Sequence, residues 1–128
     1  MNYRTDFSRV AGLGSAKDGV RHWWFQRLTS VALIPLTFIF VFAMGSSLGG
    51  GHQSVTATFA NPFIAVSTLL FLIAGFHHLQ QGLQVVIEDY VHSKRLATGC
   101  FVLNILLCWT FAVIGIFAVV RLSLGIIG

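Results

Sequence analysis

A chain of 128 residues with 55% hydrophobic and only 9% charged residues has too few charged side chains to cover a soluble core, because soluble surfaces carry roughly 25% or more. The formal net charge of +4 does not indicate a nucleic-acid partner, since nucleic-acid proteins gather basic residues on a soluble face rather than around apolar runs. The composition therefore predicts one small membrane domain, residues 1–128, in contact with lipid.

The first 27 residues form a polar arm with most of the basic residues of the chain, which are Arg4, Arg9, Lys17, Arg21 and Arg27. We expect no cleavable leader here, because charges precede the first apolar run and no small-residue cleavage pattern follows a short one. Trp23 and Trp24 belong at the headgroup level, where amphipathic rings are favoured. The arm is predicted to lie on the membrane surface or against a soluble partner.

Three apolar runs follow, at about 28–48, 62–88 and 96–124. Each reaches or exceeds the roughly 20 residues that a helix needs to cross the hydrocarbon layer. Pro35 inside the first run removes a backbone donor and is expected to bend that helix. Pro62 suits the first turn of the second helix, where its missing donor costs nothing. The pattern predicts an all-α membrane protein with three transmembrane helices.

The two loops between these runs differ in charge. Segment 45–61 is rich in glycine and serine and has no Lys, Arg, Asp or Glu, whereas Lys94 and Arg95 follow the second run. By the positive-inside rule, the N-terminus and the second loop are cytoplasmic and the C-terminus is outside, with Arg121 outnumbered. Without a cleavable leader, we expect a multi-pass protein of a bacterial inner (plasma) membrane with a periplasmic C-terminus.

The second run ends in "FHHLQQGLQVVIEDYVH", residues 76–92, which is unusually polar for a span. A charge at the bilayer centre costs about 2.5–3.5 kcal/mol on insertion scales, so polar residues there mark function. Helical geometry puts Gly82 and Asp89 on the face of His78, with Gly75 just above, and places His78 about 16 Å from Asp89. An imidazole between two glycines suits a flat macrocycle with a nitrogen-ligated iron.

A rival stripe lies about 100° away on the same helix. It consists of His77, Gln81, Gln84 and Glu88. Spacing alone does not exclude His77, although His78 has Gly75 and Gly82 one turn away on each side and His77 does not. Either histidine could instead form only a hydrogen bond between helices.

Asp89 and Tyr90 stand together at the predicted cytoplasmic end of this helix. A phenol beside a carboxylate at the edge of the hydrocarbon can donate a hydrogen bond to a carbonyl of an amphipathic ligand and pass protons inward. A quinone is such a ligand. The alternative is an interfacial anchor, with the tyrosine in the aromatic belt and the acids solvated.

Two segments carry a resemblance to a known family. "GLGSAKDGVRHWWFQRLTSVAL", residues 12–33, and "HxxxGLQxVIEDYVH", residues 78–92, resemble the small hydrophobic membrane-anchor subunits of succinate dehydrogenase, respiratory complex II. The resemblance extends over nearly the whole chain. It implies half of a heterodimeric haem-binding helix bundle, which shares one haem b with a partner cytochrome b subunit.

The resemblance also implies roles for individual residues. His78 would be an axial ligand of the haem iron, and Tyr90 with Asp89 would lie at the ubiquinone site. Arg27 would lie near the haem propionates, with Arg21 or His22 assisting.

In such a complex a flavoprotein subunit oxidises succinate, an iron–sulfur subunit carries the electrons and ubiquinone is reduced at the membrane. This step links the tricarboxylic acid cycle to the respiratory chain. The chain would have no catalytic residue of its own, no contact with succinate and no activity alone. Two alternatives stay open: a cofactor-free scaffold or assembly protein, and the anchor of a quinol:fumarate reductase.

Overall fold

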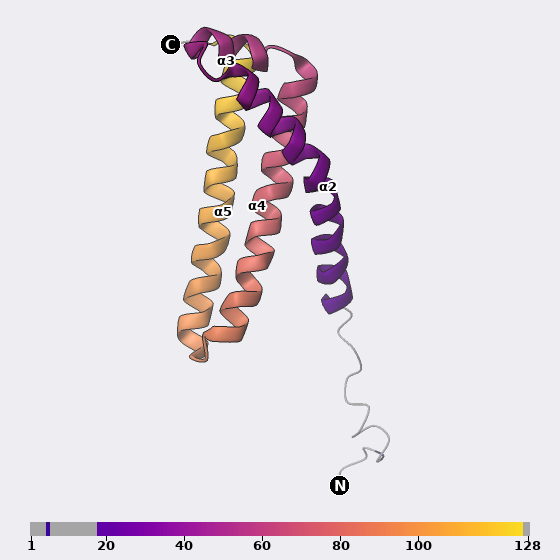
Figure 1. Ribbon diagram of the computed structural model, residues 1–128. Coiled ribbons are helices and arrows are strands. Elements are labelled where there is room, and N and C mark those ends of the chain that lie inside the picture. The colour runs from indigo at the N-terminus through magenta and orange to yellow at the C-terminus, as the bar shows by residue number, and fades with distance from the viewer. Residues whose placement is uncertain (1–4, 6–17, 127–128) are drawn as a thin grey trace.

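The computed structural model describes residue 5 and residues 18–126, and within these residues it contains four α-helices and no strand. The helices are α2 (Asp18–Ser47), α3 (Gly51–Phe59), α4 (Pro62–Tyr90) and α5 (Lys94–Ser123) (Figure 1). Of these, α2, α4 and α5 are long and apolar enough to cross a membrane. The prediction of an all-α membrane protein with three spanning helices is confirmed. The predicted contacts of most of the N-terminal arm lie outside the described residues.

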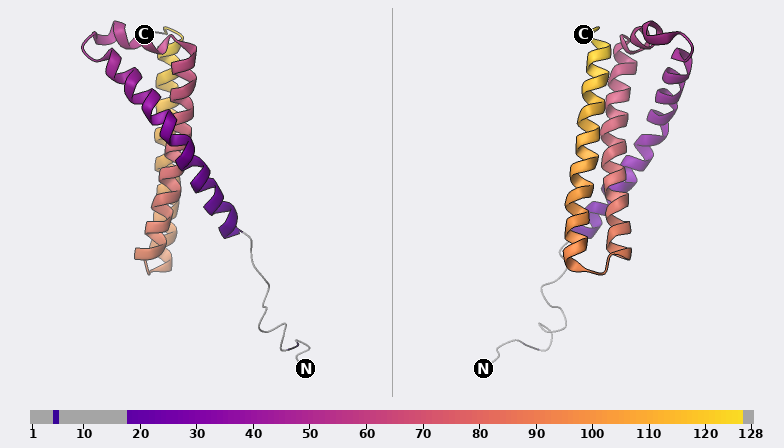
Figure 2. Two further views of the ribbon diagram at one scale, coloured as in Figure 1. Left: turned by 45° about the vertical axis from the view of Figure 1, so that its right-hand side comes forward. Right: turned by 90° about the vertical axis from the view of Figure 1, so that its left-hand side faces the viewer.

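The three long helices are not packed equally. Helices α4 and α5 run antiparallel side by side along their lengths, whereas α2 crosses α4 obliquely (Figure 2). The start of α2 and the connection between α4 and α5 lie toward one end of the molecule, and α3 lies at the other end with the last turn of α5 (Figure 1). The start of α2 and the second loop thus lie on one side, and the first loop and the end of α5 on the other, as the predicted topology requires.

Helix α2 begins at Asp18, well before the predicted start near residue 28. Hydropathy marks where side chains are apolar, but backbone hydrogen bonding can continue into the headgroup region, where polar side chains are solvated. Its 30 residues span about 45 Å. Arg21, His22 and Arg27 therefore project from a regular helix rather than from an irregular arm, and Pro35 lies within α2.

Helix α3 occupies a segment that the glycine and serine content identified only as a loop. Gly49 and Gly51 have φ angles of 88° and 66°, in the left-handed region that favours glycine, and so they turn the chain from α2 into α3. Phe59 of α3 is only 2% exposed and forms a buried cluster with Ala65 and Val119. Val55 and Phe59 are four residues apart, a spacing typical of one face of a helix, but the prediction of a loop did not use this pattern and included no helix here.

The buried cluster of Phe59, Ala65 and Val119 lies toward the α3 end of the molecule. Within α2, Ala43 and Ser47 are buried, both near its C-terminal end, and no residue from 20 to 42 is buried. A stacked pair of rings, Phe40 and Phe71 with centroids 4.7 Å apart, joins α2 to α4 further along. The N-terminal half of α2 therefore has little packing within this chain.

Helix α4 starts as the sequence predicts. Pro62 occupies the first turn, and the side chain of Asn61 accepts a hydrogen bond of 2.9 Å from the backbone N–H of Phe63. Asparagine is among the best N-cap residues, because its side chain satisfies a donor that the first turn leaves open. The start of α4 is thus determined by two adjacent residues, Asn61 and Pro62.

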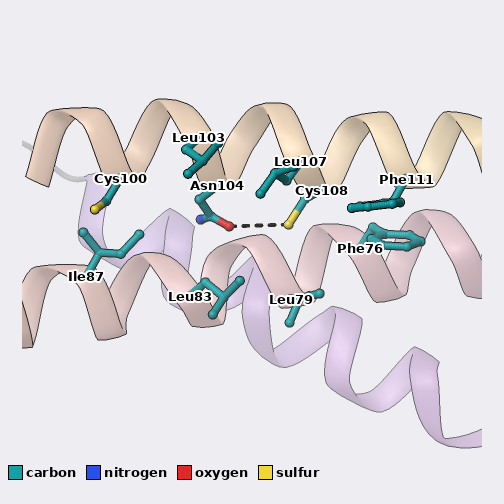
Figure 3. A pocket seen from close by; sticks show the side chains of 10 residues that line it. All are labelled: Phe76, Leu79, Leu83, Ile87, Cys100, Leu103, Asn104, Leu107, Cys108 and Phe111. Atoms are coloured by element: carbon teal, nitrogen blue, oxygen red, sulfur yellow. Dashed lines mark hydrogen bonds between the residues drawn. The ribbon is translucent and has the colours of Figure 1, made fainter.

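A buried polar side chain links α5 to α4. The Nδ2 group of Asn104 donates to the backbone carbonyl of Gln80 at 2.9 Å, and its Oδ1 accepts from the Cys108 thiol at 3.4 Å (Figure 3). Asparagine often bonds across helices in membrane bundles. This bond ties the two helices together within three residues of His77 and His78.

Replacing Asn104 with leucine should lower the free energy of unfolding in detergent by about 0.6–1.7 kcal/mol, the size of interhelical hydrogen bonds in membrane bundles. Leucine keeps the volume and removes the donor. Thr98→Ala is the matched control, because the Thr98 hydroxyl donates to the Lys94 carbonyl of its own helix. An unfolding curve of the leucine variant that overlays that of the unmodified chain would contradict the assignment.

Candidate functional site

His78 is half-buried on α4 and directs its imidazole toward α2. Its Nδ1 lies 3.1 Å from the hydroxyl oxygen of Thr29, a residue that sequence reasoning did not select. The same hydroxyl lies 2.9 Å from the Phe25 carbonyl and 3.0 Å from the Gln26 carbonyl. The histidine thus faces a neighbouring helix, and Nε2 is the ring nitrogen that remains for another ligand.

The two glycines beside His78 have different surroundings. A Cβ atom built on Gly82 would meet no atom within 4 Å. A Cβ atom on Gly75 would lie 3.8 Å from Cδ2 of Leu33 on α2, an ordinary van der Waals contact. Gly75 also lines an apolar pocket of about 280 Å³ on the surface of α4. The open space that the sequence predicts beside the histidine is therefore clearest at Gly82.

His77 faces a different part of the molecule. Its ring centroid lies 6.4 Å from that of Trp109 on α5. It also lines an open pocket of about 530 Å³, with both polar and apolar surface, between the first turns of α2 and the middle of α4. The other residues lining this pocket are Arg21, His22, Phe25 and Gln81. The structure therefore brings Arg21 and His22 together beside His77 rather than directly at His78.

Gln81 contributes an unsatisfied polar atom. Its side chain is only 5% exposed, and its Oε1 is buried without a hydrogen-bond partner among the described residues. A buried acceptor without a donor costs about 1–3 kcal/mol. A ligand, a water or a partner subunit that reaches this side of the pocket would remove that cost.

Arg27 does not line this pocket. Its guanidinium carbon lies 5.0 Å from the centroid of the exposed Trp23 ring, one turn earlier on α2. A guanidinium over the face of an indole is held by cation–π attraction and keeps its N–H edge free for a carboxylate. Arg27 and Trp23 thus form a pair on the outer surface of the helix.

Asp89 and Tyr90 occupy the last turn of α4 and are both exposed, Tyr90 by 78%. Beside them in the last turn, Oε1 of Glu88 accepts a hydrogen bond of 2.9 Å from Nε2 of Gln84, one turn earlier. Asp89 and Tyr90 lie eleven and twelve residues from His78, or about 16–18 Å of helical rise. Their side chains therefore lie exposed at the end of the helix.

The described residues include no group of three or more His, Cys, Asp or Glu side chains that could hold a metal ion. Residue 5 and residues 18–126 thus offer single imidazoles rather than a complete coordination shell. A separate apolar pocket of about 370 Å³ lies between α4 and α5 (Figure 3). The residues of α4 that line it lie between Phe76 and Ile87, and those of α5 lie between Cys100 and Phe111. Cys108 is buried in this interface.

Comparisons with known proteins agree with this architecture. Residues 1–117 match the model of the family described as "Succinate dehydrogenase/Fumarate reductase transmembrane subunit". The succinate dehydrogenase hydrophobic membrane anchor subunit of Paracoccus denitrificans is 31% identical over 99% of this chain and 98% of its own length. The subunit of that name from Rickettsia typhi is 26% identical over 84% and 86%. The membrane anchor subunit of Reclinomonas americana is 28% identical over 62% and 68%. No solved structure matches the chain.

Proposed function

This chain belongs to the family of succinate dehydrogenase/fumarate reductase transmembrane subunits, and on that premise we propose that it binds haem b and contributes to a ubiquinone site. The chain is a multi-pass membrane anchor subunit. Its proposed partners are a flavoprotein subunit, an iron–sulfur subunit and a cytochrome b membrane subunit, with which it would form a succinate:ubiquinone oxidoreductase.

The observation that carries the haem proposal is the position of His78, between Thr29 of α2 and the open space at Gly82. A b-type haem shared between two subunits needs one imidazole nitrogen from each and space for a flat ring. The contact with Thr29 engages Nδ1 and leaves Nε2 for iron, and Gly82 adds no side chain one turn away. These residues fit the group. When bound, haem supplies one-electron redox chemistry.

Three basic residues of α2 are proposed to pair with the haem propionates. Thr29 is level with His78, and along the helix Arg27, His22 and Arg21 follow at about 3, 10 and 12 Å toward the start of α2. Guanidinium groups pair with carboxylates through two parallel hydrogen bonds. The pocket between α2 and α4 supports the parts of Arg21 and His22, and the free guanidinium edge supports Arg27.

Tyr90 and Asp89 are proposed as the contribution of this chain to ubiquinone reduction. The Tyr90 hydroxyl donates a hydrogen bond to a quinone carbonyl, and the neighbouring Asp89 carboxylate moves a proton toward it. The high exposure of both side chains leaves them available for a pocket whose other walls come from the iron–sulfur and cytochrome b subunits. The isolated chain is expected to be inactive.

The distribution of basic residues supports a cytoplasmic location for the start of α2. Arg21, Arg27, Lys94 and Arg95 gather toward the end where α2 begins and α4 joins α5 (Figure 1). Arg121 lies toward the other end. By the positive-inside rule, the first end faces the cytoplasm of a bacterial inner membrane and the C-terminus faces the periplasm.

A second candidate for the axial ligand is His77. The observation that favours it is the open pocket, because His77 shares this pocket with Arg21 and His22, two of the residues proposed for the propionates. The two histidines are separated by the matched variants described in the Discussion.

The proposed function is tested by purifying the tagged chain from membranes of its own cells. We expect flavin-bearing and iron–sulfur proteins to purify with it, together with a reduced-minus-oxidised b-type haem spectrum and succinate:ubiquinone activity. A complete complex without that spectrum would remove the haem from the proposal. A chain that purifies without these subunits would favour the scaffold alternative, and faster quinol oxidation by fumarate would favour a fumarate reductase.

A further inference from the structure

We propose that Thr29 is a positioning residue for the axial histidine. Its hydroxyl oxygen accepts a hydrogen bond from the Nδ1–H of His78, which fixes the ring tautomer and keeps Nε2 unprotonated for iron. The inference rests on the proposed haem-binding function. It adds a residue on a different helix, 49 positions away in sequence, to the site.

The 3.1 Å contact fits either tautomer of the ring, and we assign the direction of the hydrogen bond from the other partners of the hydroxyl. The Thr29 hydroxyl has one hydrogen and three neighbours in range: the Phe25 carbonyl at 2.9 Å, the Gln26 carbonyl at 3.0 Å and His78 Nδ1 at 3.1 Å. Carbonyl oxygens only accept, so either carbonyl takes that hydrogen, as threonine hydroxyls in helices commonly arrange. The contact with His78 is then a hydrogen bond in which the protonated Nδ1 donates and the hydroxyl oxygen of Thr29 accepts.

The acceptor is also held rigidly. The β-branched threonine side chain has few favourable rotamers in a helix, and the two carbonyls of the preceding turn select the one that places Oγ1 against His78. Ser30 makes the same kind of bond, from its hydroxyl to the Gln26 carbonyl at 2.8 Å. Ser30 therefore offers a matched control one position away, with a helix-internal bond of its own.

This hydrogen bond should change the electronic character of the ligand. Donation from Nδ1–H makes an imidazole a stronger electron donor to a metal through its other nitrogen. A stronger donor stabilises ferric over ferrous haem and lowers the reduction potential. Loss of the acceptor leaves the ring free to rotate or to exchange its proton between the two nitrogens.

The test uses the complete complex with Thr29→Val, which keeps the branched shape and removes the hydroxyl, and with Thr29→Ser, which restores it. Potentiometric titration of the haem band and the electron paramagnetic resonance spectrum of the ferric haem are measured, with haem content per complex. We expect a more positive midpoint potential and an altered low-spin signal for the valine variant. Its haem affinity should fall about 10- to 100-fold, as for other residues that orient a metal ligand.

We expect Thr29→Ser and Ser30→Ala to resemble the unmodified complex. If Thr29→Val does not assemble, Thr29→Ala removes the same hydroxyl with a smaller side chain. Identical potentials and spectra in the valine, alanine and unmodified complexes would overturn the inference, as would an equal shift in Ser30→Ala. If His78→Ala loses the haem while Thr29→Val changes nothing, only this inference fails. If His78→Ala keeps the haem, the proposed ligand itself is wrong.

Discussion

Replacing His78 with alanine should abolish the b-type absorbance of the assembled complex. Alanine removes the imidazole nitrogen proposed as the iron ligand and leaves Gly75, Gly82 and the basic residues of α2 in place. Changes that only orient a metal ligand already cost about 10- to 100-fold in affinity, so loss of the ligand itself should cost more. Haem per complex, measured by pyridine haemochrome absorbance against protein-bound flavin, is the quantity to compare.

His77→Ala is the matched control for this experiment. It removes an imidazole from the adjacent residue, which is also half-buried but lies beside Trp109 and the pocket with Arg21 and His22. We expect this variant to keep its haem. The reverse pattern, with haem lost in His77→Ala and kept in His78→Ala, would move the ligand to the rival stripe and make the open pocket the haem site.

Replacing Tyr90 with phenylalanine should keep the haem and slow ubiquinone reduction by about 100-fold, the lower range for loss of a positioned proton donor. The phenolic oxygen is the only group removed, and the 78% exposure of the side chain means that internal packing should not change. Turnover is measured with succinate and a short-chain ubiquinone. Succinate oxidation by a soluble dye that bypasses the quinone is measured alongside and should stay unchanged.

Glu88→Gln is the control for the tyrosine variant. It alters a side chain of the same helix end, whose carboxylate accepts a hydrogen bond from Gln84, without touching the proposed donor. Normal ubiquinone kinetics in Tyr90→Phe would leave the tyrosine as an interfacial anchor. A slow dye reaction would instead locate the defect in assembly.

The spanning helices could be predicted from the sequence because their cause is local. A run of about 20 apolar residues is long enough for a helix to span the hydrocarbon layer, whichever helices pack beside it. The first turn of α4 is local too, since Asn61 and Pro62 are adjacent. The start of α2 at Asp18 could not be found this way, because hydropathy does not report where backbone hydrogen bonds end.

The candidate site was only partly accessible from sequence. Helical periodicity separated the stripes of His77 and His78, because both belong to one regular helix. It did not identify the surroundings of either residue. The contact with Thr29 and the pocket with Arg21 depend on how α2 crosses α4, which is set by long-range packing. The adjacent polar residues Thr29 and Ser30 at the start of the apolar part of α2 were a local sign that this part of the helix had a polar neighbour.

The uneven burial of α2 has a consequence for biogenesis. Its buried residues, Ala43 and Ser47, lie near its C-terminal end, and residues 20–42 have none. In a newly inserted copy without partner subunits, buried packing would therefore hold α2 only near its C-terminal end, and the rest of α2 would depend on half-buried contacts such as that between Thr29 and His78. Such a copy should be an early target of quality-control proteases, and the proposed haem should be loaded only after the subunits have met.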